Sequence, residues 1–399
     1  MANSNLNAAA KNKNDEFYTQ YDDIQREMNC YYLYNKDFLR GKTVLLPCDD
    51  PEWSKFTEFF VENFEIYGLK KLISTSYAVN SKKIKYPAQP TLWEAASPQF
   101  NADITDSRGK IFTLDQNNYV HGVHHPNKLQ WEYLQGDGDF RSDEVKALRE
   151  EADVIITNPP FSLFREFLKW INPDEKKFLI IGNINCLTYK EVFPLIKENK
   201  IWLGPSIHSG DRKFYVPDNY PLEAATCGID EETGRKFINV KGVRWFTNLE
   251  HNYRHEPLRL MTMAQCLRYH PKIKHLEEYQ KYDNYDAIEV PATDAIPEDY
   301  PGVMGVPITF LDKYCPEQFE IVGMTSGREE FGMKPTKRYQ NAIQHNTNGT
   351  TGSGSKVNTG PAILFSEKPN GTYYTADNAD GFLQILYQRY LIRHKFPDS

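Results

Sequence analysis

One short run constrains the fold more than any other: a strand that ends in Asn-Pro-Pro-Phe and continues into a helix. Residues 154–156 are apolar and β-branched, which predicts a buried strand. Pro159 and Pro160 remove backbone donors and hold the preceding residues extended, so the strand ends there. Apolar residues then recur at helical spacing over residues 163–171. In an open α/β sheet, ligands bind at this place, the carboxyl end of a strand.

A second run predicts that the sheet is parallel. Residues 42–47 are expected to form a strand, followed by a helix that Asp50 caps and Pro51 begins. Gly68 ends that helix and residues 71–76 form the next strand, which completes a βαβ unit. Further elements are expected as a helix at 143–151, strands at 130–134 and 177–181, a helix from 188 to 199, and strands near 214–216 and 243–247 that complete the sheet.

Composition excludes several classes of protein. The chain has 399 residues, 40% hydrophobic and 25% charged, which is typical of a globular protein, and no apolar stretch is long enough to span a bilayer. The start lacks the apolar segment of a signal peptide, so we expect a cytoplasmic protein. Six scattered cysteines include no Cys-x-x-Cys pair, and we expect reduced thiols and no metal site.

The net charge of −7 argues against a protein that coats nucleic acid by charge alone. The charge is uneven, however. Residues 321–399 carry nine Lys/Arg and six Asp/Glu, or +3, which leaves 38 against 48, or −10, for the rest. A basic end on an acidic body permits a local nucleic-acid face.

The change of composition along the sequence predicts three regions of the chain. Residues 1–14 form a flexible polar leader, and residues 15–255 form the α/β domain, with a polar insertion at about 80–130. Residues 256–399 form a smaller, loop-rich region, in which the low-complexity stretch at about 346–360 is expected to be a mobile loop.

The tetrapeptide Asn158-Pro159-Pro160-Phe161 suits an amino group on a flat ring. The Asn158 side-chain oxygen and the Pro159 carbonyl are two acceptors on a stiff backbone, and they match the two N–H donors of such a group. Phe161 offers a face on which a base can stack, a contact worth about 1–3 kcal/mol. That could offset much of the cost of pulling a base from a duplex. The alternative is a turn that merely ends a strand.

Two acidic turns narrow the range of co-substrates that the site could bind. A phosphate-binding loop needs glycines and a lysine, whereas Cys48-Asp49-Asp50-Pro51 has neither. Carboxylates suit a cationic ligand or hydroxyl groups, as in S-adenosylmethionine, although they could simply cap a helix. In the turn around Asp137, Asp139 could accept from an adenine amino group and Phe140 could pack on its ring. A plain turn is the alternative there, and the full pattern of a calcium loop is missing.

With these residues placed, the sequence resembles the adenine-specific DNA methyltransferases of the EcoRI type. The resemblance covers most of residues 15–319 and none is evident after about Gly323. It rests on ordered motifs, namely Asp15-Glu16-Phe17-Tyr18-Thr19-Gln20, Cys48-Asp49-Asp50-Pro51, Gly136-Asp137-Gly138-Asp139-Phe140, Thr157-Asn158-Pro159-Pro160-Phe161, Ile180-Ile181-Gly182-Asn183, Ile201-Trp202-Leu203-Gly204, Phe246-Thr247-Asn248-Leu249 and Gly302-Val303-Met304-Gly305-Val306-Pro307.

The resemblance implies a Rossmann-like, seven-stranded sheet that uses S-adenosylmethionine, with a smaller C-terminal target-recognition region. The cofactor would contact Phe17, Tyr18, Thr19, Cys48, Asp49, Asp50, Pro51, Asp137, Asp139 and Phe140. Asn158, Pro159, Pro160 and Phe161 would be the catalytic residues that hold a flipped adenine. Two features depart from methyltransferases at large: the first loop lacks their glycine pair, and the second strand ends in Ser74-Thr75-Ser76 with no acid.

The implied function is site-specific methylation of adenine N6 in duplex DNA, in a restriction-modification system or as a solitary modification. The same chemistry on RNA adenine or on cytosine N4 is one alternative, and a catalytically silent DNA-binding regulator is another. The protein would be a cytoplasmic monomer encoded by a bacterium or phage, needing no stable protein partner even where a cognate restriction endonuclease exists. Phosphate contacts are expected from Lys334, Lys337, Arg338, Arg389 and Arg393, for which solvated surface charge is the alternative.

Overall fold

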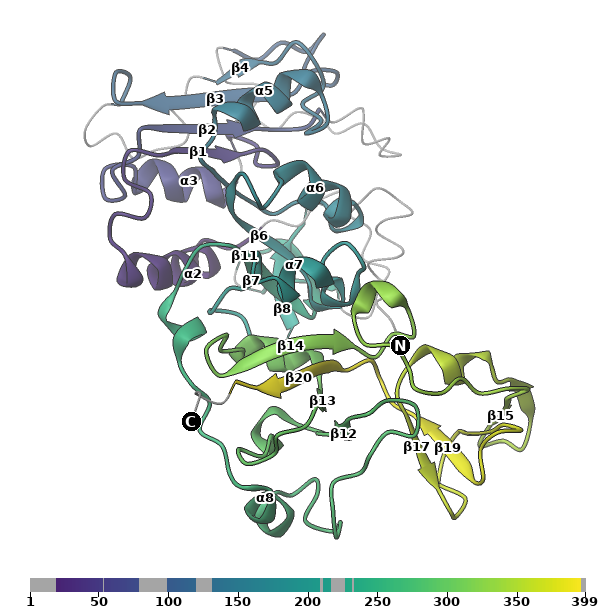
Figure 1. The fold of residues 1–399 in the computed structure, drawn as a ribbon. Helices are drawn as coiled ribbons and strands as arrows, with labels where there is room; N and C mark the ends of the chain where they lie inside the picture. Colours follow the sequence, from purple (N-terminus) through teal and green to yellow (C-terminus); the bar gives the residue numbers. More distant parts are fainter. Residues whose placement is uncertain are drawn as a thin grey trace. The chain divides into compact units, whose positions relative to one another are not determined.

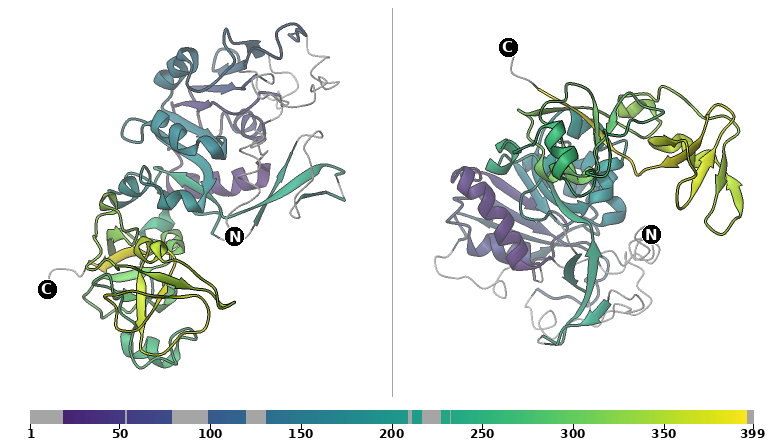
Figure 2. Two further views of the ribbon diagram at one scale, coloured as in Figure 1. Left: turned by 90° about the vertical axis from the view of Figure 1, so that its right-hand side faces the viewer. Right: turned by 90° about the horizontal axis from the view of Figure 1, so that it is seen from below.

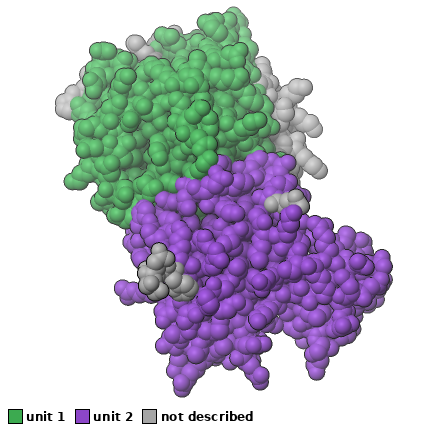
Figure 3. Space-filling view, viewed as in Figure 1, with its two compact units in different colours: residues 1–186, 200–252 green, residues 187–199, 253–399 purple. Residues whose placement is uncertain are grey.

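The computed structural model describes residues 19–52, 54–78, 99–119, 131–208, 211–216, 227–231 and 233–395. They divide into two compact units, coloured in Figure 3. Unit 1 comprises residues 1–186 and 200–252, and unit 2 comprises residues 187–199 and 253–399, each within the described ranges. Residues 187–199 were expected in the α/β domain and instead belong to unit 2. Among the residues just given, no helix is long and apolar enough to cross a membrane.

Unit 1 is built on a mixed sheet, which confirms the α/β class (Figure 1). The sheet has eight strands in the described chain, where the sequence predicted seven. Four central strands are parallel, so their carboxyl ends share one edge of the sheet. Antiparallel strands flank them on both sides. In spatial order the strands are β4 (Trp131–Tyr133), β3 (Lys110–Asp115), β2 (Lys71–Thr75), β1 (Thr43–Leu46), β5 (Val154–Thr157), β6 (Lys177–Asn183), β11 (Val243–Thr247) and β7 (Trp202–Leu203).

Helices cover both faces of this sheet because alternate residues of each buried strand point to opposite sides. Val44 and Leu46 of β1 belong to the large core that includes residues of α2 (Tyr21–Tyr34) and α3 (Lys55–Glu62). Leu45, between them, packs with Leu148 of α5 (Asp143–Glu151) and Trp170 of α6 (Phe164–Ile171). Helix α3 begins later than predicted, because Ser54 rather than Asp50 caps it.

Two parts of unit 1 correct the predicted strand assignments. Strand β3 lies inside the range expected to be an insertion, so the insertion does not cover residues 110–115. The strand expected near 214–216 does not join the main sheet. It forms a separate three-stranded sheet of β8 (Asp211–Tyr215), β10 (Lys236–Lys241) and β9 (Cys227–Ile229), which Figure 2 also shows. Phe214, Ile238 and Val240 from this small sheet are buried in the same core as the main sheet.

Unit 2 contains two sheets and few helices. Its first segment holds α7 (Phe193–Lys197), much shorter than the predicted helix and with Pro194 in its first turn, and later comes α8 (Met263–Tyr269). The first sheet has the order β12 (Ile288–Glu289), β13 (Met304–Val306), β20 (Tyr390–His394) and β14 (Phe319–Met324). The second has the order β16 (Thr351–Ser353), β15 (Ile343–His345), β18 (Tyr373–Thr375), β19 (Phe382–Ile385) and β17 (Ala362–Phe365).

The segment at 346–360, expected to be a mobile loop, has regular structure instead. It contains β16 and the 3-10 helix η9 (Ser355–Thr359). Val357 of that helix is fully buried in the small core of the five-stranded sheet. Asn358 exchanges hydrogen bonds with the backbone of Tyr339 at 2.9 and 3.0 Å. A segment whose composition is typical of mobile loops is thus anchored by one apolar side chain and one side-chain amide.

Candidate active site

Three of the predicted motifs lie at the carboxyl edge of the central strands of unit 1. The loop of residues 48–51 follows β1, and Asn158 to Phe161 follow β5. The acidic turn at 136–140 follows β4, which has the direction of β2 because both are antiparallel to β3. The sheet therefore brings the three motifs to one edge, as the α/β fold predicts. Phe17 and Tyr18 lie outside the described residues.

Asp49 connects these strand ends. Thr157, the last residue of β5, donates its hydroxyl to Asp49 Oδ2 at 2.5 Å. Ser54 donates to Asp49 Oδ1 at 2.6 Å, and the Asp49 N–H donates to the carbonyl of Thr75 at the end of β2. Burial raises the pKa of the carboxyl to about 7, against the lowering effect of the bonds from Ser54 and Thr157. Each oxygen of Asp49 thus accepts a hydrogen bond within the chain, and its contact with a cofactor stays a prediction.

The neighbouring acids have a basic partner that the sequence did not reveal. Asp50 Oδ1 accepts from the Glu52 N–H at 2.9 Å. The Lys110 ammonium lies 2.5 Å from Glu52 Oε2 and 3.7 Å from Asp50 Oδ2. It also lies over the Trp131 ring, 4.8 Å from the ring centroid. Lys110 begins β3, in the range interpreted as an insertion. The alternation of apolar Phe112 and Leu114 with polar Thr113 and Asp115 is the sequence signal that could have revealed this strand.

The second acidic turn packs directly on the end of β2. Gly138 has a φ of +81°, and a Cβ there would lie 2.0 Å from the Ser76 carbonyl oxygen, so only glycine fits. Asp137 accepts from the Ala78 N–H at 2.7 Å through its backbone carbonyl and from the Asp139 N–H at 3.1 Å through its side chain. The turn is therefore fixed at the end of β2.

The side chains predicted to hold an adenine at this turn are engaged within the protein. Burial acts to raise the pKa of Asp139, but hydrogen bonds from Arg141, the shortest of 2.6 Å, lower it. Phe140 is 5% exposed, and its ring centroid lies 5.0 Å from that of Phe167 and 5.6 Å from that of Trp170. Phe140 thus fastens the turn to α6.

The Asn-Pro-Pro-Phe segment is a stiff connection between β5 and α6. Pro160 is extended, with φ −55° and ψ 123°, and its carbonyl accepts from the Leu163 N–H at 2.9 Å. Phe161 opens the 3-10 helix η3 (Phe161–Leu163) and packs, partly buried, against the large core. Asn158 is half-buried and directly follows Thr157, the residue bonded to Asp49.

The other predicted cofactor residues differ in their surroundings. Thr19 is 5% exposed and precedes α2, and within the ranges the structure describes its Oγ1 has no hydrogen-bond partner. Pro51 is buried and Cys48 is half-buried in the loop after β1. The Oγ1 of Thr19 is a buried polar atom to which a ligand could hydrogen-bond.

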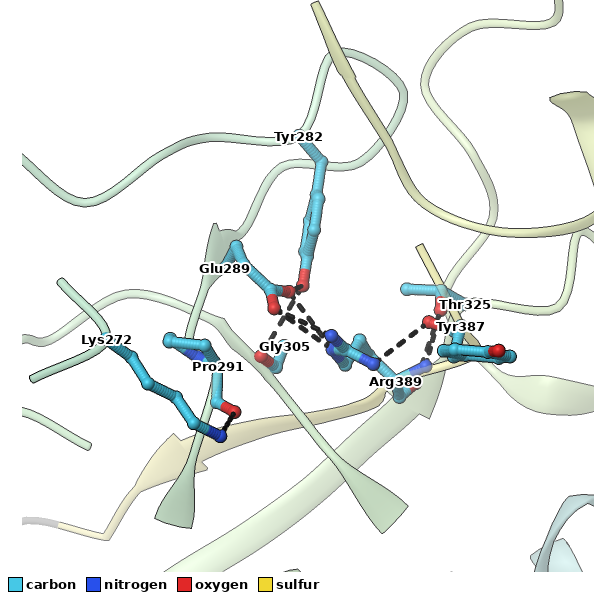
Figure 4. Close-up of polar contacts among 8 residues, drawn as sticks. All are labelled: Lys272, Tyr282, Glu289, Pro291, Gly305, Thr325, Tyr387 and Arg389. Carbon is cyan, nitrogen blue, oxygen red and sulfur yellow. Dashed lines mark hydrogen bonds and ion pairs between the residues drawn. The ribbon is translucent and has the colours of Figure 1, made fainter. Parts of the chain in front are cut away.

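The basic residues predicted to contact DNA have different environments in unit 2. Arg389 forms a buried, bidentate ion pair with Glu289, whose side chain is 8% exposed (Figure 4). That placement gives Arg389 a partner inside unit 2, and its contact with phosphate stays a prediction. Lys337 pairs with Asp283 at 3.0 Å and Arg393 with Glu320 at 2.6 Å. Arg338 and Lys334 are exposed, and Arg338 donates to the Gly327 carbonyl.

Comparisons with known proteins identify the family of this chain. The family described as adenine-specific methyltransferase EcoRI matches residues 5–367. The Type II methyltransferase M.EcoRI of Escherichia coli is 42% identical over 328 residues, which are 82% of this chain and 91% of that protein. The Type II methyltransferase M.MpnI of Mycoplasma pneumoniae is 33% identical over 318 residues, 79% of this chain and 84% of that protein. No solved structure was found to match.

The fold, the loops at the sheet edge and these matches define a site-specific, adenine-specific DNA methyltransferase. The chain belongs to the EcoRI family of these enzymes. The family match also extends past residue 323, where the sequence motifs had ended, and reaches into the five-stranded sheet of unit 2.

Proposed function

We propose that this enzyme moves the methyl group of S-adenosylmethionine to N6 of an adenine rotated out of duplex DNA. The observation that carries the proposal is the 2.5 Å hydrogen bond from Thr157 to Asp49. It fastens the residue before Asn158 to the acidic loop after β1. A base held by the tetrapeptide and a cofactor held by the loop would therefore share one edge of the sheet.

The residues at this edge fit S-adenosylmethionine better than a nucleotide phosphate. The loop after β1 offers the carboxylates of Asp50 and Glu52, and the Lys110 ammonium lies within 4 Å of both. Such a set suits a ligand that carries positive charge and hydroxyl groups. A pyrophosphate would need glycine amides or a cation facing it. When bound, the cofactor would supply an activated methyl group on a sulfonium that is already a good leaving group.

Positioning is the main contribution we assign to the protein. Asn158 and the Pro159 carbonyl would accept the two N6 hydrogens and so orient the nitrogen toward the methyl group. Phe161 would stack on the extruded ring, a contact worth about 1–3 kcal/mol. Fixed polar groups of this kind lower the barrier because they need no rearrangement during the reaction. No general base is required before the transfer.

Unit 2 is the region we propose for reading the target sequence. It is formed by a separate set of sheets, and the exposed Lys334 and Arg338 remain candidates for phosphate contacts. Contacts of this kind fix a protein on the duplex, whereas side chains in the grooves read the bases.

The test is methyl transfer from labelled S-adenosylmethionine to duplex DNA, followed by digestion to nucleosides. The expected product is N6-methyldeoxyadenosine. A label in N4-methyldeoxycytidine, or transfer to RNA but not to DNA, would support the other amino-methyltransferases and reject this proposal. Failure to label any nucleic acid would favour a silent DNA-binding protein.

A further inference from the structure

The small sheet of β8, β10 and β9 is rooted at the edge of unit 1 that carries Asn158. Strand β11, which follows β10, is antiparallel to β6 and begins opposite Asn183, the last residue of β6. The Asn183 side chain donates to the Lys241 carbonyl at 2.8 Å, and the Ile184 N–H donates to the Gly242 carbonyl at 2.6 Å. Because β6 is parallel to β5, both strands end at the same edge. The small sheet therefore extends from that edge, and both views of Figure 2 show it projecting from unit 1.

A second contact ties the small sheet to the segment predicted to hold the cofactor. Gln20 directly follows Thr19 and donates its side-chain amide to the Lys213 carbonyl of β8 at 2.8 Å. The small sheet is thus fastened both to the end of β6 and to the start of α2. A duplex that presents a base at this edge passes close to whatever projects from it.

The two faces of the small sheet differ, because side chains alternate along a strand. Phe214 of β8 pairs with Ile238 of β10, and both side chains are buried in the large core. Lys213, Tyr215 and Phe237 alternate with them and lie on the other face, which we call the outer face. Tyr215 is the register partner of Phe237. The outer face therefore carries two aromatic rings side by side, both partly exposed.

Each of these rings is in contact with a cation. The Lys213 ammonium lies 4.6 Å from the centroid of the Phe237 ring, and the Arg235 guanidinium lies 4.3 Å from that of Tyr215. Lys213 also pairs with Asp230 at 2.9 Å. Arg235 is exposed, and in the ranges that the structure describes its side chain has no acidic partner. A guanidinium that contacts a ring through its face keeps its N–H donors, which lie in its plane, for a carboxylate or a phosphate.

The backbone of Arg235 is held in a closed turn between β9 and β10. The Asp230 N–H donates to the Arg235 carbonyl at 2.9 Å, and the Gly234 N–H donates to the Asp230 carbonyl at 2.8 Å. The turn and the Tyr215 ring together restrict the guanidinium. A restricted side chain loses less entropy when it binds an anion.

We propose that the outer face of the small sheet is a DNA-contact surface of unit 1, in which Arg235 binds a phosphate of the duplex and Tyr215 positions the guanidinium. The inference rests on the proposed function, because it takes duplex DNA as the substrate. It adds a contact on unit 1 to those proposed for unit 2. The exposed guanidinium favours a polyanion over an apolar partner as the occupant of this face.

Binding of the full chain to a labelled DNA duplex of mixed sequence, measured by anisotropy between about 50 and 200 mM salt, tests this. Arg235→Met should lower the affinity about tenfold at the lower salt concentration, since a hydrogen bond to a charged group is lost. It should also reduce the slope of log affinity against log salt by about 0.9, the value for one phosphate contact.

Arg40→Met is the matched control, because it makes the same change of charge elsewhere in unit 1. Arg40 is 60% exposed, pairs with Asp37 and precedes β1, at the opposite edge of the main sheet. Both the affinity and the slope should stay close to those of the wild type.

Two substitutions test the positioning role of Tyr215. Tyr215→Leu should lower the affinity about two- to fivefold, as for loss of an exposed cation–π contact, and leave the slope unchanged. Tyr215→Phe keeps the ring and loses only the 3.3 Å contact of the hydroxyl with Asp230, so its affinity should equal that of the wild type. Thermal unfolding of each variant shows that a lower affinity does not come from a lost fold.

Unchanged affinity and slope in Arg235→Met, or equal reductions in Arg40→Met, would overturn the inference. A wild-type dimer that Arg235→Met dissociates, with DNA binding unchanged, would assign the face to a second copy of the chain instead. Methylation of DNA by the same preparations tells the two proposals apart. If the wild type methylates adenine and Arg235→Met binds DNA as the wild type does, only the contact surface fails. If the wild type neither binds nor methylates DNA, the proposed function fails with it.

Discussion

The two units use buried acids in different ways. In unit 1, Glu27 of α2 accepts hydrogen bonds from the Tyr31 hydroxyl at 2.6 Å and the Ser206 N–H at 2.9 Å, and Asp49 accepts from two hydroxyls. In unit 2, Glu289 of β12 accepts from the Arg389 guanidinium and from Tyr282. Burial raises the pKa of Glu27 and of Asp49 to about 7 against the lowering effect of these hydrogen bonds, whereas Glu289 has the positive charge of Arg389 beside it.

The difference shows two ways in which the fold accommodates a buried carboxylate. Unit 1 has a parallel centre, whose topology gathers loops and their acids at one edge. Unit 2 joins residues far apart in the chain, and Arg389 and Glu289 are one hundred positions apart. A basic residue near the C-terminus is thus bound to an acid of the same unit, although its sequence position suggested a contact with DNA.

The largest effect on stability is expected from breaking the pair in unit 2. Arg389→Met leaves Glu289 buried without its cation, which should lower the free energy of unfolding by about 3–5 kcal/mol. Urea denaturation measures this loss. Arg393→Met is the control, because its pair with Glu320 is exposed and should contribute at most about 1 kcal/mol. Equal losses in both variants would contradict the structural role of Arg389.

A smaller, pH-dependent effect is expected from the buried acid of α2. Burial raises the pKa of Glu27 to about 7, against the bonds from Ser206 and Tyr31. A raised pKa in the folded state means that the stability from this group is full below the unfolded pKa of about 4.3 and is lost as the pH rises through 7. Between pH 5 and pH 8 the unfolding free energy of Glu27→Gln should therefore gain about 2–3 kcal/mol relative to wild type.

Urea denaturation of both proteins at the two pH values measures the gain. Asp37→Asn controls for the loss of one negative charge, since the Asp37 side chain is 65% exposed. A difference between Glu27→Gln and wild type that stays constant from pH 5 to pH 8 would show that Glu27 does not titrate in this range.

The smallest predicted effect is on the binding of the target adenine. Phe161→Ala should weaken binding to target DNA by about 1–3 kcal/mol, because a stacking face is lost. Cofactor affinity should change much less, since Phe161 follows β5 rather than β1. Paired titrations with DNA and with S-adenosylhomocysteine measure the two effects. A larger loss for the cofactor than for DNA would contradict the stacking role.

The sequence predicted unit 1 better than unit 2 for physical reasons. The βαβ pattern and the strand before Asn158 are local signals, and they led to the correct sheet edge. The partners of each acid are not local: Thr157 lies 108 positions from Asp49, and Lys110 lies 58 positions from Glu52. Periodicity shows which residues are buried, but it does not show which distant side chain each buried acid will meet.

The elements β16 and η9 within 346–360 were missed for a related reason. The glycines, serines and threonines of this segment are typical of mobile segments. One buried valine, Val357, and the bonds of Asn358 to Tyr339 are enough to order it in the five-stranded sheet. Such anchors are single residues, and the average composition of a segment does not reveal them.

The central claim is that the edge of the unit 1 sheet holds cofactor and base side by side, with Asn158 acting on the base alone. The most direct test is Asn158→Ala, assayed for cofactor affinity by calorimetry and for methyl transfer in a single turnover. We expect cofactor affinity within about twofold of wild type and a rate lowered by about 10²–10³ or more, as for loss of one fixed polar group at a reacting centre. Substantial turnover in Asn158→Ala, or a loss of cofactor binding as large as the loss of rate, would contradict the account.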